Sequence, residues 1–468
     1  MPIRTALLAA VLFAVPTATS AQSLSPAEVA QVDAVVTRSL ADTGVPSASI
    51  AIVRGGQVVF TRAYGKQSER RAAPDARLPY QIASVSKQFT AAALLLLEDE
   101  GKLSLDDTVD RYVPGITGGD RITLRQLLSH TSGLQDYWPQ DYSFKAMGTP
   151  VTPQQILDRW ARKPLDFAPG TQWQYSNTGY VVAGLVVEKV SGQPLLDFLQ
   201  ARIFRPLGIV ASDQDLAVGP GFPQGYGRYG LGPIRVVQPA AHGWLYAAGE
   251  LSMSAGDLAK WDVARIDRAL LPADDWAAQE TPVRLTDGST NGYGLGVSTG
   301  ARDGRRYVEH SGEAVGFLSE NIVFPDERAA VVVLTNSWFS DAVNRIADGV
   351  IAAALPARDS SASRDDAAAL AKARQVYDQL RAGRLDAALL TEDANYYFTP
   401  TARGDYAASL GTLGEPKDFR QTGRTRLRGG FVIRTYRVTY PSRALAVSTF
   451  TEPGENGRFE QFLVAPTQ

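Results

Sequence analysis

The chain has 468 residues, 44% of them hydrophobic and 21% charged, so it is long enough for two or three folding units with sizeable cores. Its formal net charge of -2 excludes the basic footprint typical of nucleic-acid binders. The absence of cysteine excludes a disulfide framework and a lipid-anchored cysteine, and three histidines in separate segments do not form a zinc motif. The composition favours a small molecule or a neutral polymer as partner, with neither nucleic acid nor metal.

The N-terminus reads MPIRTALLAAVLFAVPTATSAQ. Arg4 forms a short basic region, residues 6–15 an apolar one, and Thr19-Ser20-Ala21 a small-residue cleavage site. This pattern predicts a signal peptide, residues 1–21. The apolar run is shorter than the roughly 20 residues that a membrane span needs. The mature protein is therefore expected to be periplasmic or secreted, with no stable membrane anchor.

Four elements are expected before residue 101. Residues 26–44 read as an amphipathic helix, and residues 47–65 alternate as two strands around Gly55-Gly56. Residues 84–100 read as a helix that is apolar on nearly every side and closed by Gly101, which indicates burial between other layers. Ser84 would lie at its N-terminal end.

The middle of the chain, residues 105–275, is mostly short helices and loops, and strands return at 290–336 before a helix at 341–355. Strands therefore come from both ends of a domain spanning residues 22–355. The expected class is α/β (α+β): an antiparallel sheet flanked by helices, beside a mostly helical subdomain. A cleft would lie between them.

A polar stretch without apolar periodicity, residues 356–366, predicts a linker. Residues 367–468 then read as a small α+β accessory domain, with one helix followed by alternating strands. Their order resembles the cone-shaped nuclear-transport-factor or SnoaL-like domains. Ligand binding, dimerisation and covering of a sheet edge all remain open for this unit, and the sequence does not predict an oligomeric state.

A serine and a lysine open the apolar helix. Ser84 and Lys87 are three positions apart, so they share one helix face and the amine can reach the hydroxyl. A serine becomes a good nucleophile when a neighbour accepts its proton, and a helix N-terminus favours a developing oxyanion. The alternative for this pair is a capping serine beside a solvated lysine.

A second polar group, Tyr175-Ser176-Asn177, lies on a loop between a Pro-Gly turn and an apolar helical run. Nearby cations would favour the phenolate of Tyr175, which would then serve as general base beside Lys87. Asn177 would hydrogen-bond a substrate amide. The alternative is a turn in which Asn177 caps the following helix.

A third group, His310-Ser311-Gly312, lies on a predicted strand. Period-two alternation puts Ser311 and Glu313 on one face and His310 and Gly312 on the other. Glycine permits another backbone to approach closely, and the strand edge would bind substrate as an added strand and donate an N–H to an oxyanion. The alternative is a structural histidine.

The motifs SVSK (84–87), YSN (175–177) and HSG (310–312) together resemble those of penicillin-recognising serine hydrolases: class C β-lactamases, D-alanyl-D-alanine carboxypeptidases and related esterases. The resemblance covers about residues 27–355 and includes ITLRQLLSHTSGL (122–134), YGLGV (293–297) and VFPDERAAVVVLTN (323–336).

The resemblance implies a β-lactamase-like fold and a cofactor-free serine hydrolase acting through an acyl-enzyme. Ser84 would be acylated, with Lys87 and Tyr175 moving its proton to the leaving group. The resemblance does not decide which of the two is the main base. Four residues would contact the substrate: Asn177, His310, Ser311 and Gly312. The backbone N–H groups of Ser84 and Glu313 would form the oxyanion hole.

Two departures bear on the substrate. His310 stands where many β-lactamases have lysine, and a histidine is mostly uncharged at neutral pH, so its grip on a β-lactam carboxylate weakens. Glu313 adds a negative charge nearby. These features favour a small-molecule or peptide substrate of the D-amino-acid peptidase or esterase type. The alternatives are a β-lactamase and, in another class, a non-turnover module that binds cell-wall peptides or senses them.

A rival serine occurs in GVSTG, residues 296–300, which matches the G-x-S-x-G nucleophile elbow. That elbow requires a strand followed directly by a helix. Here GARDGRR and another strand follow, which predicts that Ser298 lies in a hairpin turn. His130 and His242 are predicted to be structural.

Overall fold

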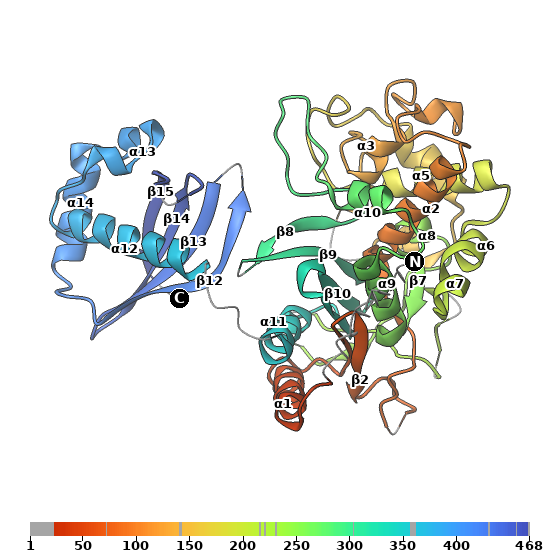
Figure 1. The fold of residues 1–468 in the computed structure, drawn as a ribbon, viewed down its shortest axis with the longest axis horizontal. Helices are drawn as coiled ribbons and strands as arrows, with labels where there is room; N and C mark the ends of the chain where they lie inside the picture. The colour runs from red at the N-terminus through yellow and green to blue at the C-terminus, as the bar shows by residue number, and fades with distance from the viewer. Residues whose placement is uncertain are drawn as a thin grey trace, which may run out of the picture.

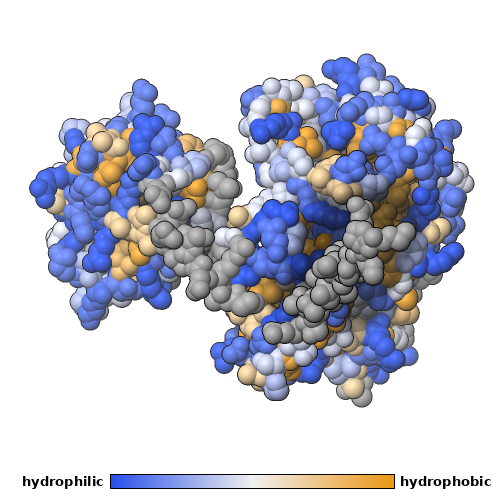
Figure 2. All heavy atoms as spheres, in the orientation of Figure 1, coloured by the Kyte–Doolittle hydropathy of each residue, from blue (hydrophilic) through white to orange (hydrophobic). Residues whose placement is uncertain are grey.

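The computed structural model describes residues 23–71, 73–139, 143–214, 217–219, 221–229, 232–302, 304–355, 362–428, 431–454 and 456–466. The predicted signal peptide, 1–21, lies outside the described residues. Figure 1 shows a larger unit followed by a smaller C-terminal one. Hydrophilic side chains cover most of the visible face of both units (Figure 2). Within the described residues, no helix is long and apolar enough to cross a membrane.

The larger unit is built on a six-stranded antiparallel sheet in the order β2-β1-β11-β10-β9-β8. The strands are β1 (Ser47–Arg54), β2 (Gln57–Gly65), β8 (Ser298–Arg302), β9 (Arg305–Ala314), β10 (Phe317–Phe324) and β11 (Ala329–Thr335). The N-terminal hairpin joins the later strands because β1 pairs with β11, with Ile50 opposite Val333. This confirms the prediction of a sheet built from both ends of the domain.

Alternation along the strands gives the sheet two buried faces. Ile50 and Ile52 of β1 belong to one core cluster, whereas Ala51 and Val53 belong to another. The first cluster includes residues of α1 (Pro26–Thr43) and α11 (Ala342–Ala354), which lie side by side (Figure 1). The second includes residues of α2 (Lys87–Asp99) and α9 (Ala255–Asp267). Helices therefore cover the sheet on both sides.

Helix α2 runs through the interior between the sheet and the helical subdomain. All residues from Lys87 to Leu97 are buried, which confirms the predicted burial of this segment. Helix α2 contacts the subdomain helices α5, α8, α10 and α6. The subdomain helices are α3 (Leu124–Leu128), α4 (Pro153–Ile156), α5 (Asn177–Ser191), α6 (Leu195–Leu199), α7 (Arg205–Leu207), α8 (Tyr246–Gly249) and α10 (Ala273–Glu280). The short strands are β3 (Tyr80–Gln81), β4 (Ala211–Asp213), β5 (Tyr226–Gly227), β6 (Arg235–Val236) and β7 (Leu251–Met253).

The first of the strands predicted within 290–336, NGYGLGV at 291–297, is wrong. Gly292 and Gly296 have φ angles of 86° and 77°, which break an extended run, and the strand β8 begins only at Ser298. Ser298 therefore opens a strand instead of lying in the hairpin turn. Strand β8 pairs directly with β9, so no helix follows Ser298 and the elbow geometry of an α/β-hydrolase is absent, as predicted.

The C-terminal unit has three helices and a four-stranded antiparallel sheet among its described residues, with a core of its own. Its helices are α12 (Ala362–Arg381), α13 (Glu392–Tyr397) and α14 (Pro400–Gly411), and its strands, paired in sequence order, are β12 (Asp418–Arg428), β13 (Phe431–Thr439), β14 (Ala444–Thr451) and β15 (Phe459–Pro466). The α+β content agrees with the prediction, whereas the cone shape stays a prediction. Figure 1 shows β12 next to β8, and the two strands contact one another.

The predicted linker, 356–366, is too long. Its first six residues, 356–361, lie outside the described residues, and helix α12 has already begun at Ala362. The missing apolar periodicity reflects a polar first turn. Asp366, close to this helix start, suits the positive end of the helix dipole, so a polar stretch is also a good helix start.

Candidate active site

Ser84 lies in a 3-10 turn, Ala83–Ser86, that leads directly into α2. The preceding residue, Ala83, has a φ of 50°, a backbone conformation that non-glycine residues rarely adopt. Ala83 and Val85 are buried, while Ser84 is half-buried. The turn therefore presents the Ser84 hydroxyl to solvent from buried flanks, at the start of the helix where the sequence predicts it.

The Lys87 amine lies within hydrogen-bond distance of three oxygens. Its Nζ is 3.0 Å from Ser84 Oγ, 2.8 Å from Asn177 Oδ1 and 2.7 Å from the Ala248 carbonyl oxygen. The last two oxygens only accept, so two N–H bonds of the amine are committed to them. A neutral amine then directs its lone pair at Ser84, which is the arrangement that removes a hydroxyl proton.

Burial changes the protonation of Lys87. Its side chain has no exposed surface, and this desolvation lowers the pKa of Lys87 to about 7, against a smaller opposing effect of Asp136. The nitrogen also lies 4.9 Å from the ring centroid of Tyr175 and 5.3 Å from that of Tyr180. Near neutral pH, a large fraction of this amine is therefore free base.

Tyr175 ends the loop before α5, and the cap of that helix is Ser176, whose Oγ accepts from the backbone N–H of Gly179 at 3.3 Å. The alternative in which Asn177 is the cap is thus wrong. Burial raises the pKa of Tyr175 far above its usual value, Asp136 raises it further, and an interaction with Ser84 opposes both only in part. The predicted phenolate of Tyr175 is therefore not favoured.

Asp136 is a site residue that the sequence did not reveal. Its Oδ1 accepts from the backbone N–H groups of Trp138 and Asn177, both at 3.1 Å, and from Asn177 Nδ2 at 3.2 Å. These bonds turn the amide of Asn177 so that Oδ1 faces Lys87. Burial raises the pKa of Asp136. Nothing local marks this residue among the 49 acidic residues of the chain.

The two histidines His130 and His310 are joined through Tyr293. The backbone N–H of Ser176 donates to His130 Nδ1 at 3.1 Å, so the proton of a neutral His130 is on Nε2, which lies 3.2 Å from the Tyr293 hydroxyl. That hydroxyl lies 2.8 Å from His310 Nε2, and His310 Nδ1 lies 2.5 Å from the Ser311 carbonyl oxygen. A carbonyl only accepts, so Nδ1 of His310 carries its proton and Tyr293 donates to Nε2.

The surroundings of His130 and His310 keep both imidazoles in the neutral form. His130 and His310 have only 1% and 6% of their surface exposed. Burial and the nearby Lys87 lower the pKa of His310 to about 3 and hold that of His130 well below its usual value. The rings of Tyr175 and His310 have centroids 6.3 Å apart, and Tyr175 lines the pocket beside Ser84 whereas His310 does not. The geometry thus favours a positioning role for His310 over the direct substrate contact that the sequence predicts.

Strand β9 passes beside the nucleophile. A side chain at Gly312 would place its Cβ 2.2 Å from the Ile82 carbonyl oxygen and 3.1 Å from the Ser84 nitrogen, so only glycine permits this approach. The pairing of β8 with β9 ends at Ser298 opposite Glu309. Among the described residues, the 310–314 stretch of β9 thus has a strand neighbour on one side only. Ser311 and Glu313 are exposed and share a face, as predicted.

A pocket of about 490 Å³ borders the nucleophile. Its described lining is half aromatic or apolar: Ser84, Asp136, Trp138, Pro139, Gln174, Tyr175, Asn177, Leu245, Glu313 and Trp338. Ser84, Tyr175 and Asn177, predicted from separate motifs, therefore meet at one cleft, together with Glu313. His310 is absent from this lining. Among the described residues, no group of three or more potential ligands would hold a metal ion.

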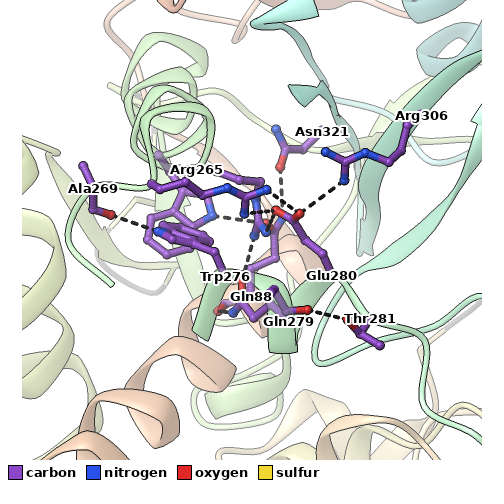
Figure 3. A network of polar contacts seen from close by, with 12 residues as sticks. Gln88, Arg265, Ala269, Trp276, Gln279, Glu280, Thr281, Arg306 and Asn321 are labelled. Carbon is purple, nitrogen blue, oxygen red and sulfur yellow. Dashed lines mark hydrogen bonds and ion pairs between the residues drawn. The ribbon is translucent and has the colours of Figure 1, made fainter. Parts of the chain in front are cut away.

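Gln88, the residue after Lys87, holds α2 in place through hydrogen bonds to buried side chains. Gln88 Oε1 accepts from Trp261 Nε1 at 3.1 Å and from Arg265 Nη2 at 2.9 Å, while Gln88 Nε2 donates to Asn321 Oδ1 at 2.9 Å. Figure 3 shows this network, in which Arg265 and Arg306 both point toward Glu280. The network ties α2 to α9, α10 and β10, and thereby fixes the helix that carries Lys87.

Comparison with known proteins agrees with this geometry. The profile of the Beta-lactamase family matches residues 32–355, which is more than half of the chain. The chain belongs to the Beta-lactamase family. A penicillin-binding protein of Bacillus subtilis is 30% identical over 311 residues, which cover 62% of this chain and 67% of that protein. The D-aminopeptidase of Brucella anthropi is 30% identical over 337 residues, which cover 69% of this chain and 62% of that enzyme.

Solved structures extend the comparison. A D-stereospecific amidohydrolase from a Streptomyces species superposes with a TM-score of 0.60 at 29% identity, covering 70% of this chain and 99% of that one. The D-amino acid amidase of Ochrobactrum anthropi SV3 gives 0.60 at 25% identity, covering 70% and 98%. The predictions of a β-lactamase-like fold and of a serine hydrolase related to the β-lactamases are confirmed.

Proposed function

We propose that this protein cleaves amide, peptide or ester bonds of D-amino-acid derivatives through an acyl-enzyme on Ser84. The observation that carries the proposal is the Lys87 amine, buried, with its pKa near 7, and 3.0 Å from a hydroxyl that borders an open pocket. Relatives named as a D-aminopeptidase, a D-stereospecific amidohydrolase and a D-amino acid amidase support this class of substrate.

In the acylation step, neutral Lys87 takes the Ser84 proton while Oγ forms a bond to the substrate carbonyl carbon. The carbonyl oxygen becomes an oxyanion, which the backbone N–H groups of Ser84 and Glu313 stabilise. The bond to the leaving group then breaks. Its nitrogen or oxygen receives the proton through the hydroxyl of Tyr175, which stays protonated because of its raised pKa.

In deacylation, the same groups act on water. Lys87 accepts a proton as water adds to the acyl carbon, and the bond from Ser84 Oγ to that carbon breaks as Oγ regains a proton. Asn177, held by Asp136, offers its amide edge to the substrate, and the open edge of β9 pairs with the substrate backbone. His310, Ser311 and Gly312 shape that edge. None of these steps needs a cofactor.

The site of action follows from the N-terminus. We expect export with cleavage after Ala21, so that the mature enzyme begins at Gln22 in the periplasm or outside the cell. N-terminal sequencing of protein from a cell fraction tests this. An intact N-terminus on protein that stays in the cytosol would contradict export without touching the chemistry.

Hydrolysis of β-lactams is the second candidate, favoured by the penicillin-binding relative. A neutral, buried His310 offers no positive charge to the β-lactam carboxylate, which places this activity behind cleavage of D-amino-acid derivatives. A module that is acylated but does not turn over is the alternative of another class.

The test is covalent labelling with a fluorescent phosphonate and a fluorescent penicillin. We expect phosphonate labelling of the wild type, loss of labelling in Ser84→Ala, and full labelling in Ser298→Ala, the matched control at the rival serine. Labelling that survives Ser84→Ala would overturn the proposal. So would the failure of the wild type to label with any acylating reagent.

Rates of substrate hydrolysis then rank the candidate functions. We expect a D-alanyl 4-nitroanilide or ester to be hydrolysed faster than a chromogenic cephalosporin, with both activities lost in Ser84→Ala. Faster cephalosporin hydrolysis would replace the leading candidate by the second. A stable adduct on Ser84, seen by intact mass without multiple turnover, would favour the binding module.

A further inference from the structure

The charges on the pocket walls point to one class of substrate. Among the described lining residues, two carry charged side chains, Asp136 and Glu313, and both are acidic. No described lysine or arginine belongs to the lining. A substrate that enters this pocket therefore meets negative potential beside the nucleophile.

The two basic side chains nearest the chemistry do not offset this charge. Lys87 is fully buried and spends its hydrogen bonds on Ser84, Asn177 and the Ala248 carbonyl oxygen. The ring of His310 is buried, and both of its nitrogens are engaged, one with the Tyr293 hydroxyl and one with the Ser311 carbonyl oxygen. A carboxylate on the substrate would meet two acids, while the nitrogens of both basic residues are already engaged in hydrogen bonds within the protein, which is unfavourable.

The carboxylate of Asp136 is held firmly in place. Backbone N–H groups of Trp138 and Asn177 bind one of its oxygens, and the side-chain amide of Asn177 reaches both oxygens, at 3.2 and 3.3 Å. The same amide contacts Lys87 at 2.8 Å. The negative charge is therefore fixed one amide away from the Lys87 amine, in the pocket that Ser84 also lines.

Aromatic walls strengthen the attraction for a cation. The pocket is lined by the rings of Trp138, Tyr175 and Trp338, and the faces of such rings attract ammonium groups. A fixed carboxylate together with aromatic faces is suited to an ammonium group and poorly suited to an anion. Glu313, exposed at the pocket on the stretch of β9 that does not pair with β8, adds a second carboxylate.

We propose that the pocket selects acyl donors that carry a free α-ammonium group, with Asp136 as the main anchor and Glu313 as the second. This inference rests on the proposed function and narrows it. The enzyme removes N-terminal D-residues or hydrolyses D-amino-acid amides and esters, and it discriminates against substrates that carry a carboxylate at this position, such as acyl donors capped with a diacid.

The experiment uses three substrates that differ only at nitrogen: the 4-nitroanilides of D-alanine, N-acetyl-D-alanine and N-succinyl-D-alanine. At pH 7 the free α-amino group, with a pKa of about 7.7–8.0, is mostly protonated. We expect kcat/KM for D-alanine to exceed that for the acetyl form by roughly tenfold or more, the value of a hydrogen bond to a charged group. The succinyl form is expected to be slowest. Added salt should reduce these ratios.

Two variants locate the preference. Asp136→Asn removes the charge and keeps an oxygen for the Asn177 backbone, so the ratio of D-alanine to acetyl substrate should fall by about tenfold. Glu313→Gln changes only an exposed side chain and should lower the ratio about two- to fivefold. The rate of labelling by a neutral phosphonate reports whether Asp136→Asn has also disturbed Ser84, because that reagent has no ammonium group.

The outcomes separate this inference from the proposed function. An enzyme that labels on Ser84 but treats the amine and acetyl forms alike, or keeps its preference in both variants, overturns the ammonium anchor and leaves the hydrolase standing. An enzyme that labels on Ser84 but hydrolyses none of the anilides can be tested by competition. The concentrations of D-alanine amide and of N-acetyl-D-alanine amide that halve the rate of Ser84 labelling are then compared, and their ratio reports the same preference. An enzyme that never labels on Ser84 overturns both.

Discussion

Lys87 and Gln88 are neighbours on α2, and both side chains are buried, yet their surroundings differ in kind. Lys87 has one nitrogen among three oxygens, one of which is the half-buried hydroxyl of Ser84 at the pocket. The partners of Gln88, namely Trp261, Arg265 and Asn321, are all buried (Figure 3). The Lys87 side of the helix therefore faces the pocket, whereas the Gln88 side packs against buried side chains.

The difference lies in how each side compensates buried charge. In the Gln88 network, Arg265 pairs with Glu280 at 3.2 Å, and both carboxylate oxygens of Asp262 accept from Asn321, at 2.8 and 2.9 Å. Lys87 has no carboxylate in contact, so burial lowers its pKa. A buried charge with an oppositely charged partner stabilises the fold, whereas a buried amine without a carboxylate in contact loses its proton more easily and can act as a base.

The largest expected effect tests this contrast at the two adjacent positions. Lys87→Met should lower kcat/KM by at least ~10³-fold, because it removes the proton acceptor for Ser84, and it should leave the free energy of unfolding unchanged or higher. Gln88→Met should do the reverse, with lower stability and near-normal activity per folded molecule. Steady-state kinetics and urea unfolding on both variants measure this, and equal activity loss in the two would contradict the contrast.

A smaller effect is expected from two of the three arginines, Arg265, Arg268 and Arg306, that pair with the Glu280 carboxylate. The side chains of Arg265 and Arg306 both pair with Glu280, at 3.2 and 3.3 Å, but Arg265 is fully buried and Arg306 is 42% exposed. Arg265→Met also deprives Gln88 of a donor and should cost about 3–5 kcal/mol of unfolding free energy. Arg306→Met, the matched control, should cost less than about 1 kcal/mol. Similar losses of unfolding free energy in both variants would mean that burial does not determine how much an arginine paired with Glu280 contributes to stability.

The fold could be predicted largely from the sequence because alternation and helical periodicity are local. The hairpin at 47–65, the buried helix after Ser84 and the return of strands before residue 336 follow from patterns within single segments. The errors lie where the pattern is ambiguous. Glycines interrupt an apparent strand at 291–297, and a polar helix start at Ala362 has the composition of a linker.

The candidate site could be predicted only in part, for a physical reason. Ser84 and Lys87 are close in sequence, so helix geometry alone brings them together. The roles of Tyr175 and His310 depend on burial, which comes from distant segments and reverses the expectation of a phenolate. Asp136 enters through hydrogen bonds to Asn177, which no local pattern contains.

The smallest expected effect concerns the pH dependence of the amine. In the proposed mechanism Lys87 acts as a neutral amine, so kcat/KM for a neutral substrate should rise with pH along a limb whose apparent pKa is near 7. Asp136 raises the pKa of Lys87 because its negative charge stabilises the ammonium form. Asp136→Asn removes that charge, so the limb should move to lower pH by up to about one unit.

The pH–rate profile of N-acetyl-D-alanine 4-nitroanilide measures this shift without a titrating amine on the substrate. Glu313→Gln is the matched control, because solvent screens the charge of this exposed side chain, so its limb should stay in place. A limb that moves to higher pH in Asp136→Asn would contradict the assignment of the rising limb to Lys87. An equal shift in both variants would instead mean that the pKa of Lys87 responds to the net charge of the pocket. The difference between the surroundings of Lys87 and those of Gln88 would then depend on all the charges of the pocket and not on the Asp136 carboxylate alone.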